Sequence, residues 1–415
     1  MTRILGIAAA IVLTTAGCGR TDSQPAATTT PADQWKVAIQ PADVRPPAGS
    51  VEPQLMAAAN GGVILSWVEV DDSVATLKFT ERTGSAWSPI TTAASGDDWF
   101  VSWADVPSVT RLSDGTLVAQ WLKNVDPSIE AYDLQLSYSR DAGKTWARPF
   151  APHHDGTRTQ HGFASLLEMP GAGLGLVWLD GRQMELDTRS KDGGSMSLRF
   201  AAYDRQWKQT ADVAVDERVC ECCPTAAAVT DDGVVTAFRD RSPREIRDVH
   251  VSRLENGKWT YATPVHVDGW EIEACPVNGP ALHARGRNAV IAWFTAKDDK
   301  PHAFAAFSRD AGRTWGEPIR LDDAATLGHV DVELLEDGSA VAGWMEFADS
   351  RSSFRIRKIE ASGMRSQAIE VAGGGEHRVT GLPRLAVQGR EIVLAWTESG
   401  AAEDGREQVR VAIAK

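Results

Sequence analysis

A short apolar run that ends in an aromatic residue recurs along the chain. The seven runs end at Trp67, Trp121, Trp178, Phe238, Trp293, Trp344 and Trp396. Neighbouring copies lie between 51 and 60 residues apart. A period of this length and regularity is typical of repeat proteins, in which every repeat is one supersecondary unit.

Each run is predicted to be the second strand of a β-hairpin. Asn-Gly or Asp-Gly pairs at Gly61, Gly115, Gly233 and Gly338 precede four of the runs, and another apolar segment precedes each turn. These pairs tolerate the positive φ angles that tight hairpin turns need. A third strand follows, for example at residues 133–138, and a fourth begins near a tryptophan such as Trp146. Four antiparallel strands per repeat are typical of a β-propeller blade.

The two ends of the chain predict how the ring of blades closes. The seventh module, from about Arg378 to Lys415, stops after its third strand, whereas residues 34–39 have the tryptophan-led pattern of a fourth strand. We infer that the N-terminal strand completes the last blade, which removes the free edges that an open ring would expose. The sequence therefore predicts an all-β fold over residues 35–415, a β-propeller of four-stranded blades with seven blades counted and six as the alternative.

Two turns between third and fourth strands share a specific motif. Residues 139–146 and 308–315 have the frame Ser-x-Asp-x-Gly-x-Thr-Trp, and residues 80–87 and 252–259 are less complete versions. The Asp accepts backbone N–H groups of the turn, the Gly adopts an unusual backbone angle, and the Trp fills the gap between blades. The motif resembles the Asp-box (BNR) repeat of the sialidase-like β-propellers. That resemblance implies that the boxes are structural and lie on the face opposite the ligand site.

The N-terminus predicts export and lipid anchoring. Arg3 is followed by an apolar stretch at residues 4–13, which is too short to span a bilayer and is typical of a signal peptide over residues 1–17. The small residues before Cys18 resemble the bacterial lipobox, in which the cysteine becomes the lipidated first residue. Ordinary cleavage beside an incidental cysteine is the alternative. Residues 18–34 would form a tether to a bacterial cell membrane, either periplasmic or at the cell surface.

Composition narrows the class of ligand. The chain has 415 residues with 43 Lys and Arg against 56 Asp and Glu, a formal net charge of -13. An acidic protein repels phosphate backbones, so we expect no nucleic-acid partner. We also expect no cofactor.

Carboxylates are predicted to gather at one mouth of the propeller. If first strands run down and second strands run up, the residues two past each aromatic meet at the upper face. Five of these seven positions are acidic, and we expect them either to converge around the central channel or to form a solvated rim of unrelated charges. The candidate acid/base groups are Asp180, Asp240 and Glu346, and the candidate ligand-binding carboxylates are Glu69 and Glu398.

Arginines lie beside two of these carboxylates. Guanidinium groups bind carboxylates and phosphates in a bidentate manner, so the arginines are candidates for holding an anionic substituent, with a salt-bridge network between loops as the alternative. The resemblance to sialidases implies the first use, because those enzymes grip their substrate carboxylate with arginines. The candidates are Arg182, Arg239, Arg241 and Arg247.

Two features of the sialidases are missing from this chain. No Phe/Tyr-Arg-Ile-Pro segment is present. Sialidases also use a Tyr/Glu pair for the chemistry, and of the four tyrosines only Tyr132 lies near the start of a predicted strand that could approach the upper face. Whether the protein is a hydrolase therefore stays open at this point.

Four cysteines besides Cys18 lie just before the first strands of two neighbouring blades. An even number of cysteines outside the cytoplasm favours disulfides, which would pin the two loops together. The alternative is a thiolate metal site with His161 or His329, whose soft ligands would suit copper or zinc. The cysteines are Cys220, Cys222, Cys223 and Cys275.

Three functions follow from these patterns. The leading hypothesis is an exported, lipid-anchored, sialidase-like propeller that recognises a glycan at its upper face, with hydrolysis of that glycan left open. The first alternative is a non-catalytic scaffold whose acidic mouth docks another protein. The second alternative is a metal-handling protein that uses cysteine and histidine ligands.

Overall fold

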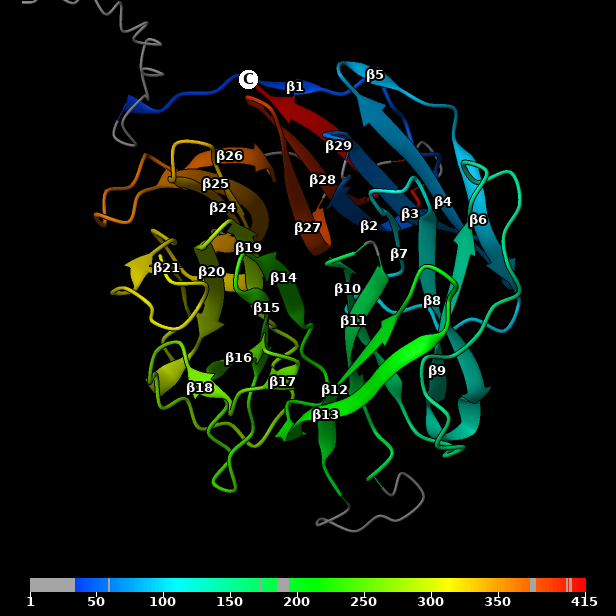
Figure 1. Ribbon diagram of the computed structural model, residues 1–415. Helices are drawn as coiled ribbons and strands as arrows, with labels where there is room; N and C mark the ends of the chain where they lie inside the picture. Colours follow the sequence, from blue (N-terminus) through cyan, green and yellow to red (C-terminus); the bar gives the residue numbers. More distant parts are fainter. Residues whose placement is uncertain are drawn as a thin grey trace, which may run out of the picture.

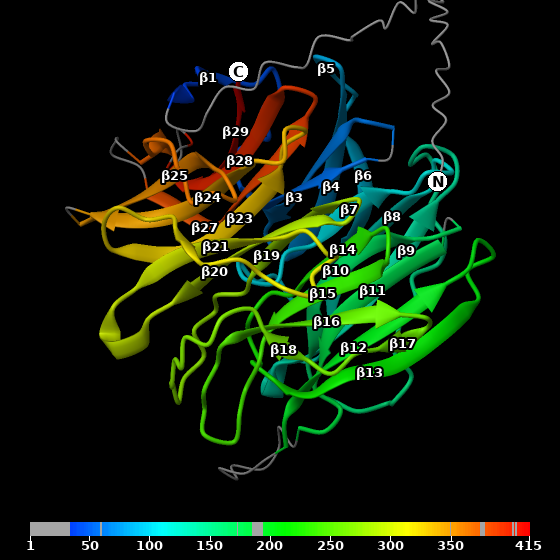
Figure 2. The same cartoon turned by 60° about the vertical axis from the view of Figure 1, so that its left-hand side comes forward.

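The chain folds into seven antiparallel sheets arranged around a central axis (Figure 1). The computed structural model describes residues 34–58, 60–171, 173–184, 194–348, 350–373, 378–400, 402 and 405–415. The predicted all-β, seven-bladed propeller is confirmed, and a second view shows the blades stacked side by side around the ring (Figure 2). The predicted signal peptide and Cys18 lie outside the described residues, as does the tether apart from its last residue. In the described part of the chain, no helix has the length and apolar character needed to cross a membrane.

The first three blades contain twelve strands. Blade 1 comprises β2 (Ser50–Ala57), β3 (Val63–Asp71), β4 (Val74–Thr83), β5 (Ala86–Trp87) and β6 (Thr91–Gly96). Blade 2 comprises β7 (Ser108–Arg111), β8 (Leu117–Asp126) and β9 (Ala131–Ser139), with the 3-10 turn η2 (Pro127–Ile129) between the last two. Blade 3 comprises β10 (His161–Met169), β11 (Gly173–Asp180), β12 (Met196–Tyr203) and β13 (Gln209–Val219).

The other four blades complete the ring. Blade 4 comprises β14 (Ala226–Thr230), β15 (Gly233–Arg239), β16 (Val249–Glu255), β17 (Lys258–Trp259) and β18 (Thr263–Pro264). Blade 5 comprises β19 (Ala281–Arg285), β20 (Asn288–Thr295), β21 (His302–Ser308) and β22 (Ile319–Arg320), with η3 (Lys297–Asp299) after β20. Blade 6 comprises β23 (Thr326–Leu334), β24 (Ala340–Ala348), β25 (Arg351–Ile359) and β26 (Ile369–Ala372). Blade 7 comprises β27 (Arg378–Gln388), β28 (Glu391–Ser399), β29 (Gln408–Ala414) and β1 (Ile39–Pro41).

Strand register defines the two faces of the ring. In blade 1, Ser50 at the start of the first strand pairs with Glu69 near the end of the second. We call the face at these ends the upper face and the opposite one the lower face. In blade 2, Ser139 at the end of the third strand pairs with Leu117 at the start of the second. The Asp boxes, which follow the third strands, therefore lie on the lower face, as expected.

The predicted closure of the ring is confirmed, with a shift in its position. The closing strand β1 begins at Ile39, which pairs with Ala414 of β29. The predicted strand at residues 34–39 thus ends where the observed one starts, and Trp35 instead packs against the apolar core of blade 7. On the other side of the closure, Arg82 of blade 1 forms an ion pair with Glu391 of blade 7 at 2.5 Å. The first and last blades are therefore joined by both a shared sheet and side chains.

The recurrent aromatic residue of the second strands fills the space between neighbouring blades. Trp67 of blade 1 packs in one cluster with Val393 and Val411 of blade 7, and Trp344 of blade 6 packs with Val290 of blade 5. Both tryptophans are fully buried. Removing such a side chain from a core costs roughly 3–5 kcal/mol. Each blade needs one such aromatic side chain to fill the space beside it. This explains why the aromatic residue recurs once per blade along the sequence.

Four of the first strands are interrupted by a β-bulge near the upper face. In β2 the register shifts between Val51 and Gln54, and corresponding shifts occur in β10, β23 and β27. Inside three of these bulges, Glu52, Phe163 and His329 have φ angles of 57°, 53° and 48°, which few residues other than glycine adopt. Bulges re-aim side chains and often lie next to functional sites. Here they redirect side chains at the upper mouth of the ring.

The Asp boxes have the predicted turn geometry. In blade 5 the Asp310 carboxylate accepts hydrogen bonds from the Thr314 backbone N–H at 2.9 Å, from the Thr314 hydroxyl at 2.6 Å and from the Ser308 hydroxyl at 2.8 Å. Although burial opposes ionisation, these hydrogen bonds lower the pKa of Asp310 to about 2. The box tryptophan of blade 2, Trp146, packs edge-on against Phe79 of blade 1 with ring centroids 6.1 Å apart. The boxes therefore brace the lower face.

We expect Asp310→Ala to lower the free energy of unfolding by about 1 kcal/mol, as loss of the side-chain hydrogen bonds of a turn usually does. Because the pKa of Asp310 is lower in the folded than in the unfolded state, its contribution is present above about pH 4 and is lost as the pH falls toward 2. Urea unfolding at several pH values measures both effects. Asp43→Ala, which changes an exposed aspartate, is the control, and equal effects of the two substitutions at neutral pH would contradict the prediction.

Candidate functional site

A cavity of about 890 Å³ opens on the upper face over blades 1, 6 and 7. Its walls come from the bulged starts of β2, β23 and β27, the ends of β24 and β28, and the connection between β6 and β7. Residues from both ends of the described chain therefore meet in it. Those that matter for its chemistry are Glu52, Trp103, His329, Phe347, Thr380 and Glu407.

Large apolar side chains are exposed around this cavity. Trp103 and Phe347 are 47% and 45% exposed, and Val101 and Leu327 are also exposed. Most apolar side chains of this size are buried in the propeller core. Exposed apolar groups gathered in one hollow are typical of a site that binds a ligand or a partner.

The connection between β6 and β7 forms one wall of the cavity by reaching across the mouth. Trp103, which lies just before blade 2, has its ring 5.4 Å from the ring of His329 in blade 6. The His329 Nδ1 atom lies 3.0 Å from the carbonyl oxygen of Gly381. Burial lowers the pKa of His329 to about 4. The imidazole is therefore neutral at pH 7, donates from Nδ1 and keeps Nε2 as an acceptor.

Two buried carboxyl groups belong to this part of the upper face. Glu52 lines the cavity, and burial, together with the nearby charges of Asp105 and Glu407, raises its pKa well above the ordinary value. Burial also raises the pKa of Asp105 to about 7, although its carboxylate accepts the Phe163 backbone N–H at 2.7 Å. Within the described ranges, Oε2 of Glu52 has no hydrogen-bond partner. Burial thus favours the protonated form of Glu52, which makes it the candidate proton donor to a ligand in the cavity.

Three of the predicted acidic positions accept a hydrogen bond from an indole in their own strand. Residues two apart on a strand lie on the same side of the sheet, so each carboxylate reaches the tryptophan two positions before it. Neither Asp180 nor Glu346 is more than 4% exposed. The three therefore cap indoles inside their blades and do not converge on the channel. The pairs are Trp67 with Glu69 at 2.9 Å, Trp178 with Asp180 at 3.0 Å, and Trp344 with Glu346 at 3.2 Å.

The other two predicted carboxylates lie apart from these. The Asp240 side chain is 22% exposed and lies 3.9 Å from His250, and burial raises its pKa. Glu398 accepts a hydrogen bond from Arg410 at 3.0 Å. None of the five predicted acidic positions lines the upper cavity. The assignment of Asp180, Asp240 and Glu346 as acid/base groups stays a prediction, and their surroundings favour structural roles for Asp180 and Glu346.

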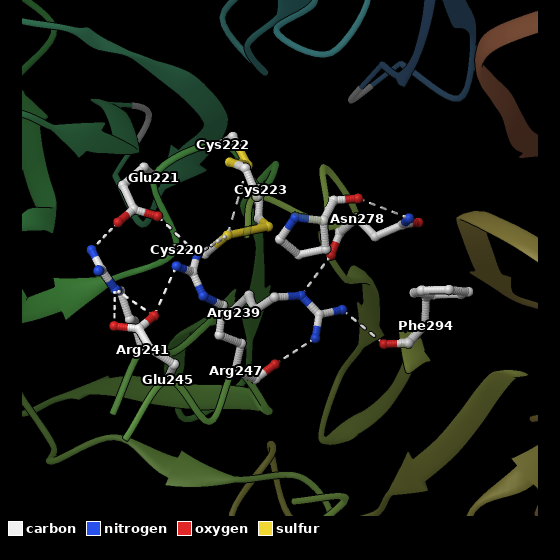
Figure 3. The surroundings of a disulfide bond; sticks show 12 residues. Cys220, Glu221, Cys222, Cys223, Arg239, Arg241, Glu245, Arg247, Asn278 and Phe294 are labelled. Carbon is white, nitrogen blue, oxygen red and sulfur yellow. Dashed lines mark hydrogen bonds and ion pairs between the residues drawn. A yellow bond between two sulfur atoms is a disulfide. The ribbon is translucent and has the colours of Figure 1, made fainter. Parts of the chain in front are cut away.

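Arg239 holds three backbone segments together (Figure 3). It is 1% exposed and donates to the carbonyl oxygens of Asn278 at 2.8 Å, Arg247 at 2.5 Å and Phe294 at 2.7 Å. Its guanidinium also lies 5.0 Å from the ring of Trp270. This geometry favours a structural role for Arg239, because its buried donors already have backbone partners, and ligand binding by Arg239 stays a prediction.

The remaining predicted arginines form ion pairs within the protein, which is the alternative that the sequence left open. Arg241 and Arg247 alternate with Glu221 and Glu245 in a closed ring of charges (Figure 3). Arg247 is 2.8 Å from Glu221 and 2.9 Å from Glu245, and Arg241 is 2.9 Å from Glu245. Arg182 donates to the carboxylate two residues before it at 2.7 Å. These arginines connect loops of the upper face.

The four cysteines lie together at the upper ends of blades 4 and 5 and form two disulfides, Cys220–Cys223 and Cys222–Cys275. Figure 3 shows the first of them beside the ring of charges. The second joins residues 53 positions apart, so it pins the loop before β14 to the loop before β19. This favours the disulfide alternative over thiolate metal binding. Three of the sulfur atoms lie within 4.8 Å of one another and could hold a metal only after reduction.

The two histidines expected near these sulfurs lie elsewhere. His329 belongs to the upper cavity, and His161 lies between blades 2 and 3 among aspartates. There, ligand-type atoms of Asp133, His153 and His161 lie within 4.8 Å of one another. His161 thus lies beside another imidazole and carboxylates, and not beside the cysteines as the metal-site alternative expected.

Comparisons with known proteins show a shared fold. No family model matches the sequence, and no curated protein matches it. A protein of unknown function from Dyadobacter fermentans is similar in structure, with 14% identity, a TM-score of 0.52, and coverage of 91% of this chain and 99% of that chain. The polysaccharide lyase Uly1 has 10% identity, a TM-score of 0.51 and coverage of 94% of both chains.

A more distant similarity extends to the sialidases. The NanB sialidase from Streptococcus pneumoniae has 9% identity and a TM-score of 0.47, covering 85% of this chain and 83% of that chain. At these identities the similarities concern the fold, and a fold of this kind supports many unrelated functions. Function has to be argued from the site.

We expect the two disulfides to stabilise the protein unequally. In the chain-entropy account, a cross-link over 53 residues stabilises the fold by about 4 kcal/mol, and one over three residues by about 2 kcal/mol. Cys222→Ser with Cys275→Ser should therefore lower the free energy of unfolding more than Cys220→Ser with Cys223→Ser. Urea unfolding of the two double variants, after peptide mapping of the pairing, measures the difference. Equal destabilisation, or a different pairing, would show that this account of the loops is wrong.

We expect Asp105 to make the protein less stable as the pH rises from about 4 to about 7. Its pKa is raised in the folded state, whereas the unfolded chain ionises near pH 4, so the folded state holds the extra proton in this window. Asp105→Asn keeps an oxygen for the Phe163 N–H and removes the titration. The variant should be more stable than wild type at about pH 8 and less dependent on pH. Urea unfolding with Asp43→Asn as control tests this, and an unchanged pH profile in Asp105→Asn would count against it.

Proposed function

We propose that the protein is an exported propeller that binds a glycan in the cavity of its upper face. One observation carries the proposal: the cavity joins exposed aromatic side chains, Trp103 and Phe347, to a buried carboxyl group, Glu52, whose pKa burial raises. A sugar ring has apolar C–H faces and polar hydroxyl groups. A largely apolar hollow with a few placed polar groups is the usual design of such a ligand site. The shared fold alone would not assign this role.

The polar groups of the cavity can satisfy sugar hydroxyls. The raised pKa of Glu52 favours its protonated form, which donates a hydrogen bond, and the neutral imidazole of His329 offers an acceptor at Nε2. The Glu407 carboxylate, which also lines the cavity, accepts from the Thr380 hydroxyl at 3.1 Å and has further acceptor capacity. Rigid aromatic surfaces contribute binding energy at little cost in side-chain entropy.

If the bound glycan is cleaved, Glu52 is the acid that we assign to the reaction. Glycoside hydrolysis needs a carboxyl group that is still protonated near neutral pH, and burial raises the pKa of Glu52 in that direction. Asp180 and Glu346 are less suited because each accepts an indole hydrogen bond in its own blade. Asp240 lies outside the cavity.

Export is part of the proposal. Two disulfides on the upper face fit an oxidising compartment, because stable disulfides are rare in the cytosol. Together with the apolar N-terminal segment and Cys18, they support a protein that is held at a bacterial membrane by a lipid on that cysteine.

The apolar rim of the cavity also favours a second candidate function, the docking of another protein. Val101, Leu327 and Phe347 are exposed side by side around the cavity, and exposed apolar patches also mark protein interfaces. A docking site would use the aromatic residues without needing the proton of Glu52. This difference separates the two candidates in an experiment.

We expect a glycan array to identify a ligand, and calorimetry with that glycan to show the effect of single substitutions. Trp103→Ala and Phe347→Ala should each weaken binding by about tenfold or more, because a central aromatic contact is typically worth more than 1 kcal/mol. Tyr261→Ala is the matched control, since Tyr261 is 97% exposed and lies outside the cavity. Glu52→Gln should keep most of the binding and abolish any cleavage of the same glycan.

The possible outcomes are distinct. Binding that is lost with Trp103 and kept in Glu52→Gln, with no cleavage by wild type, supports a glycan-binding protein without hydrolase activity. If Trp103→Ala leaves glycan binding as unchanged as Tyr261→Ala does, the proposed site is contradicted. A folded protein that binds no glycan, but captures a partner protein through Trp103, would support the docking function instead.

A further inference from the structure

A second cluster of reactive side chains lies between blades 2 and 3, outside the upper cavity. It contains two histidines and three aspartates. Asp133 lies in β9, His161 begins β10, and Asp180 ends β11, while His153 and Asp155 lie in the connection between β9 and β10. The proposed glycan site does not use any of these residues.

Three polar atoms in this cluster are buried and face one another. Oδ1 of Asp133 lies 3.2 Å from Nδ1 of His161 and 3.5 Å from Nε2 of His153. The side chain of His161 is fully buried and that of His153 is 5% exposed. Among the residues that the structure describes, none of these three atoms makes a hydrogen bond of acceptable geometry. Buried polar atoms without a partner are rare and call for an explanation, such as an ion.

The opposite edges of the two imidazoles lie against one carboxylate. Oδ2 of Asp155 is 3.1 Å from Nδ1 of His153 and 3.3 Å from Nε2 of His161. Asp155 is held in turn by the backbone N–H of Thr157 at 2.9 Å. The two rings are stacked, with centroids 3.7 Å apart and an angle of 8° between their planes. Both rings therefore present their remaining nitrogen to the same side, where Asp133 lies.

Both rings can bind one ion only after one of them turns out of the stack, because the lone pair of an imidazole nitrogen lies in the plane of its ring. A histidine ligand usually donates its second N–H to a carboxylate, which orients the ring and fixes its tautomer. Asp155 plays that role for His153 through Nδ1 and would do so for His161 once its ring turns, because Nε2 of His161 lies 3.3 Å from Asp155 without a hydrogen bond of acceptable geometry. Two atoms that each lie about 2.1 Å from one ion, at angles of about 90–110°, are roughly 3.0–3.4 Å apart. The two separations at Oδ1 of Asp133, 3.2 Å and 3.5 Å, are close to this range before any ring turns.

We propose that Asp133, His153 and His161 bind one divalent transition-metal ion, with Asp155 as the carboxylate that orients the two imidazoles. Two nitrogen donors and one carboxylate oxygen favour an ion of the zinc or ferrous class over calcium or magnesium, which prefer oxygen ligands. Three protein ligands leave at least one position for water or another ligand. The Asp133 side chain is 26% exposed, although its Oδ1 atom is buried.

The alternative is a structural cation. A protonated His161 between Asp133 and Asp155 would satisfy the charges of the cluster without any ion. The two accounts differ in one respect that can be measured, since a structural cation binds no metal at any accessible concentration.

Zinc binding to the full chain tests the proposal. The protein is purified with its disulfides intact, which a thiol titration verifies, and is stripped with a chelator before calorimetry with Zn²⁺. We expect about one ion per chain. Asp133→Asn and His153→Ala should each weaken binding by at least about tenfold, and Asp155→Asn should do so by about tenfold or more. His154→Ala is the matched control, because His154 is the exposed neighbour of His153. Thermal unfolding shows whether each variant is folded, and Asp133→Asn changes the shape of the site least.

Cobalt(II) as a second probe distinguishes the ligands. Binding to nitrogen and oxygen gives weak visible bands without a sulfur charge-transfer band, whereas binding to the cysteines of blades 4 and 5 would give that band. The proposal is overturned if the folded wild-type protein takes up no zinc, if Asp133→Asn and His153→Ala bind as tightly as wild type, or if the cobalt spectrum shows thiolate ligands. Glycan binding by these variants should be unchanged, so the two proposals can fail independently.

Discussion

Closure of the ring is the constraint on which the rest of the structure depends. Seven sheets can bury both of their faces only when the first packs against the last, and the pairing of Ile39 with Ala414 places the closing strand there. Figure 1 shows β1 beside β29 at the C-terminus. Further along, the Gly49 N–H donates to the Glu407 carbonyl at 2.9 Å. The same contacts bring Glu52 and Glu407 into one cavity, so the candidate ligand site is built across the junction of the two chain ends.

The acidic residues of the upper face divide into two kinds. Three of the four that follow a tryptophan by two positions serve the blades by accepting its buried indole N–H, and Glu398, which accepts from Arg410, is the exception. The three are Glu69, Asp180 and Glu346. Carboxyl groups on the bulged or irregular segments at the mouth, such as Glu52 and Asp105, have raised pKa values instead. Perturbed groups of this kind concentrate at functional sites. For this reason we place the candidate ligand site at the bulged segments of the upper face and not at the ends of the second strands.

The fold could be predicted from the sequence because its determinants are local and repeated. Each blade needs an apolar second strand, an aromatic plug and a tight turn, and all three recur with the blade period. The site could not be predicted in the same way. The bulge that re-aims Glu52 is made by residues without a distinctive pattern, and Trp103 lies in an irregular connection. His153 and His161 are brought together by a loop that follows no spacing rule. The structural role of Asp180 could have been predicted, because its spacing from Trp178 already places the two side chains on one side of the strand.

The central claim is that ligand binding occurs at the upper mouth across the ring closure. Hydrogen–deuterium exchange of the full chain, with and without the tightest glycan found, tests it most directly because exchange reports on every segment at once. The account predicts added protection at residues 49–52, 97–107, 327–329 and 379–381, and none in the Asp boxes at residues 139–146 and 308–315. Protection confined to the boxes, or to the blade 4 loops around Asp240, would contradict the account and move the ligand site to another part of the propeller.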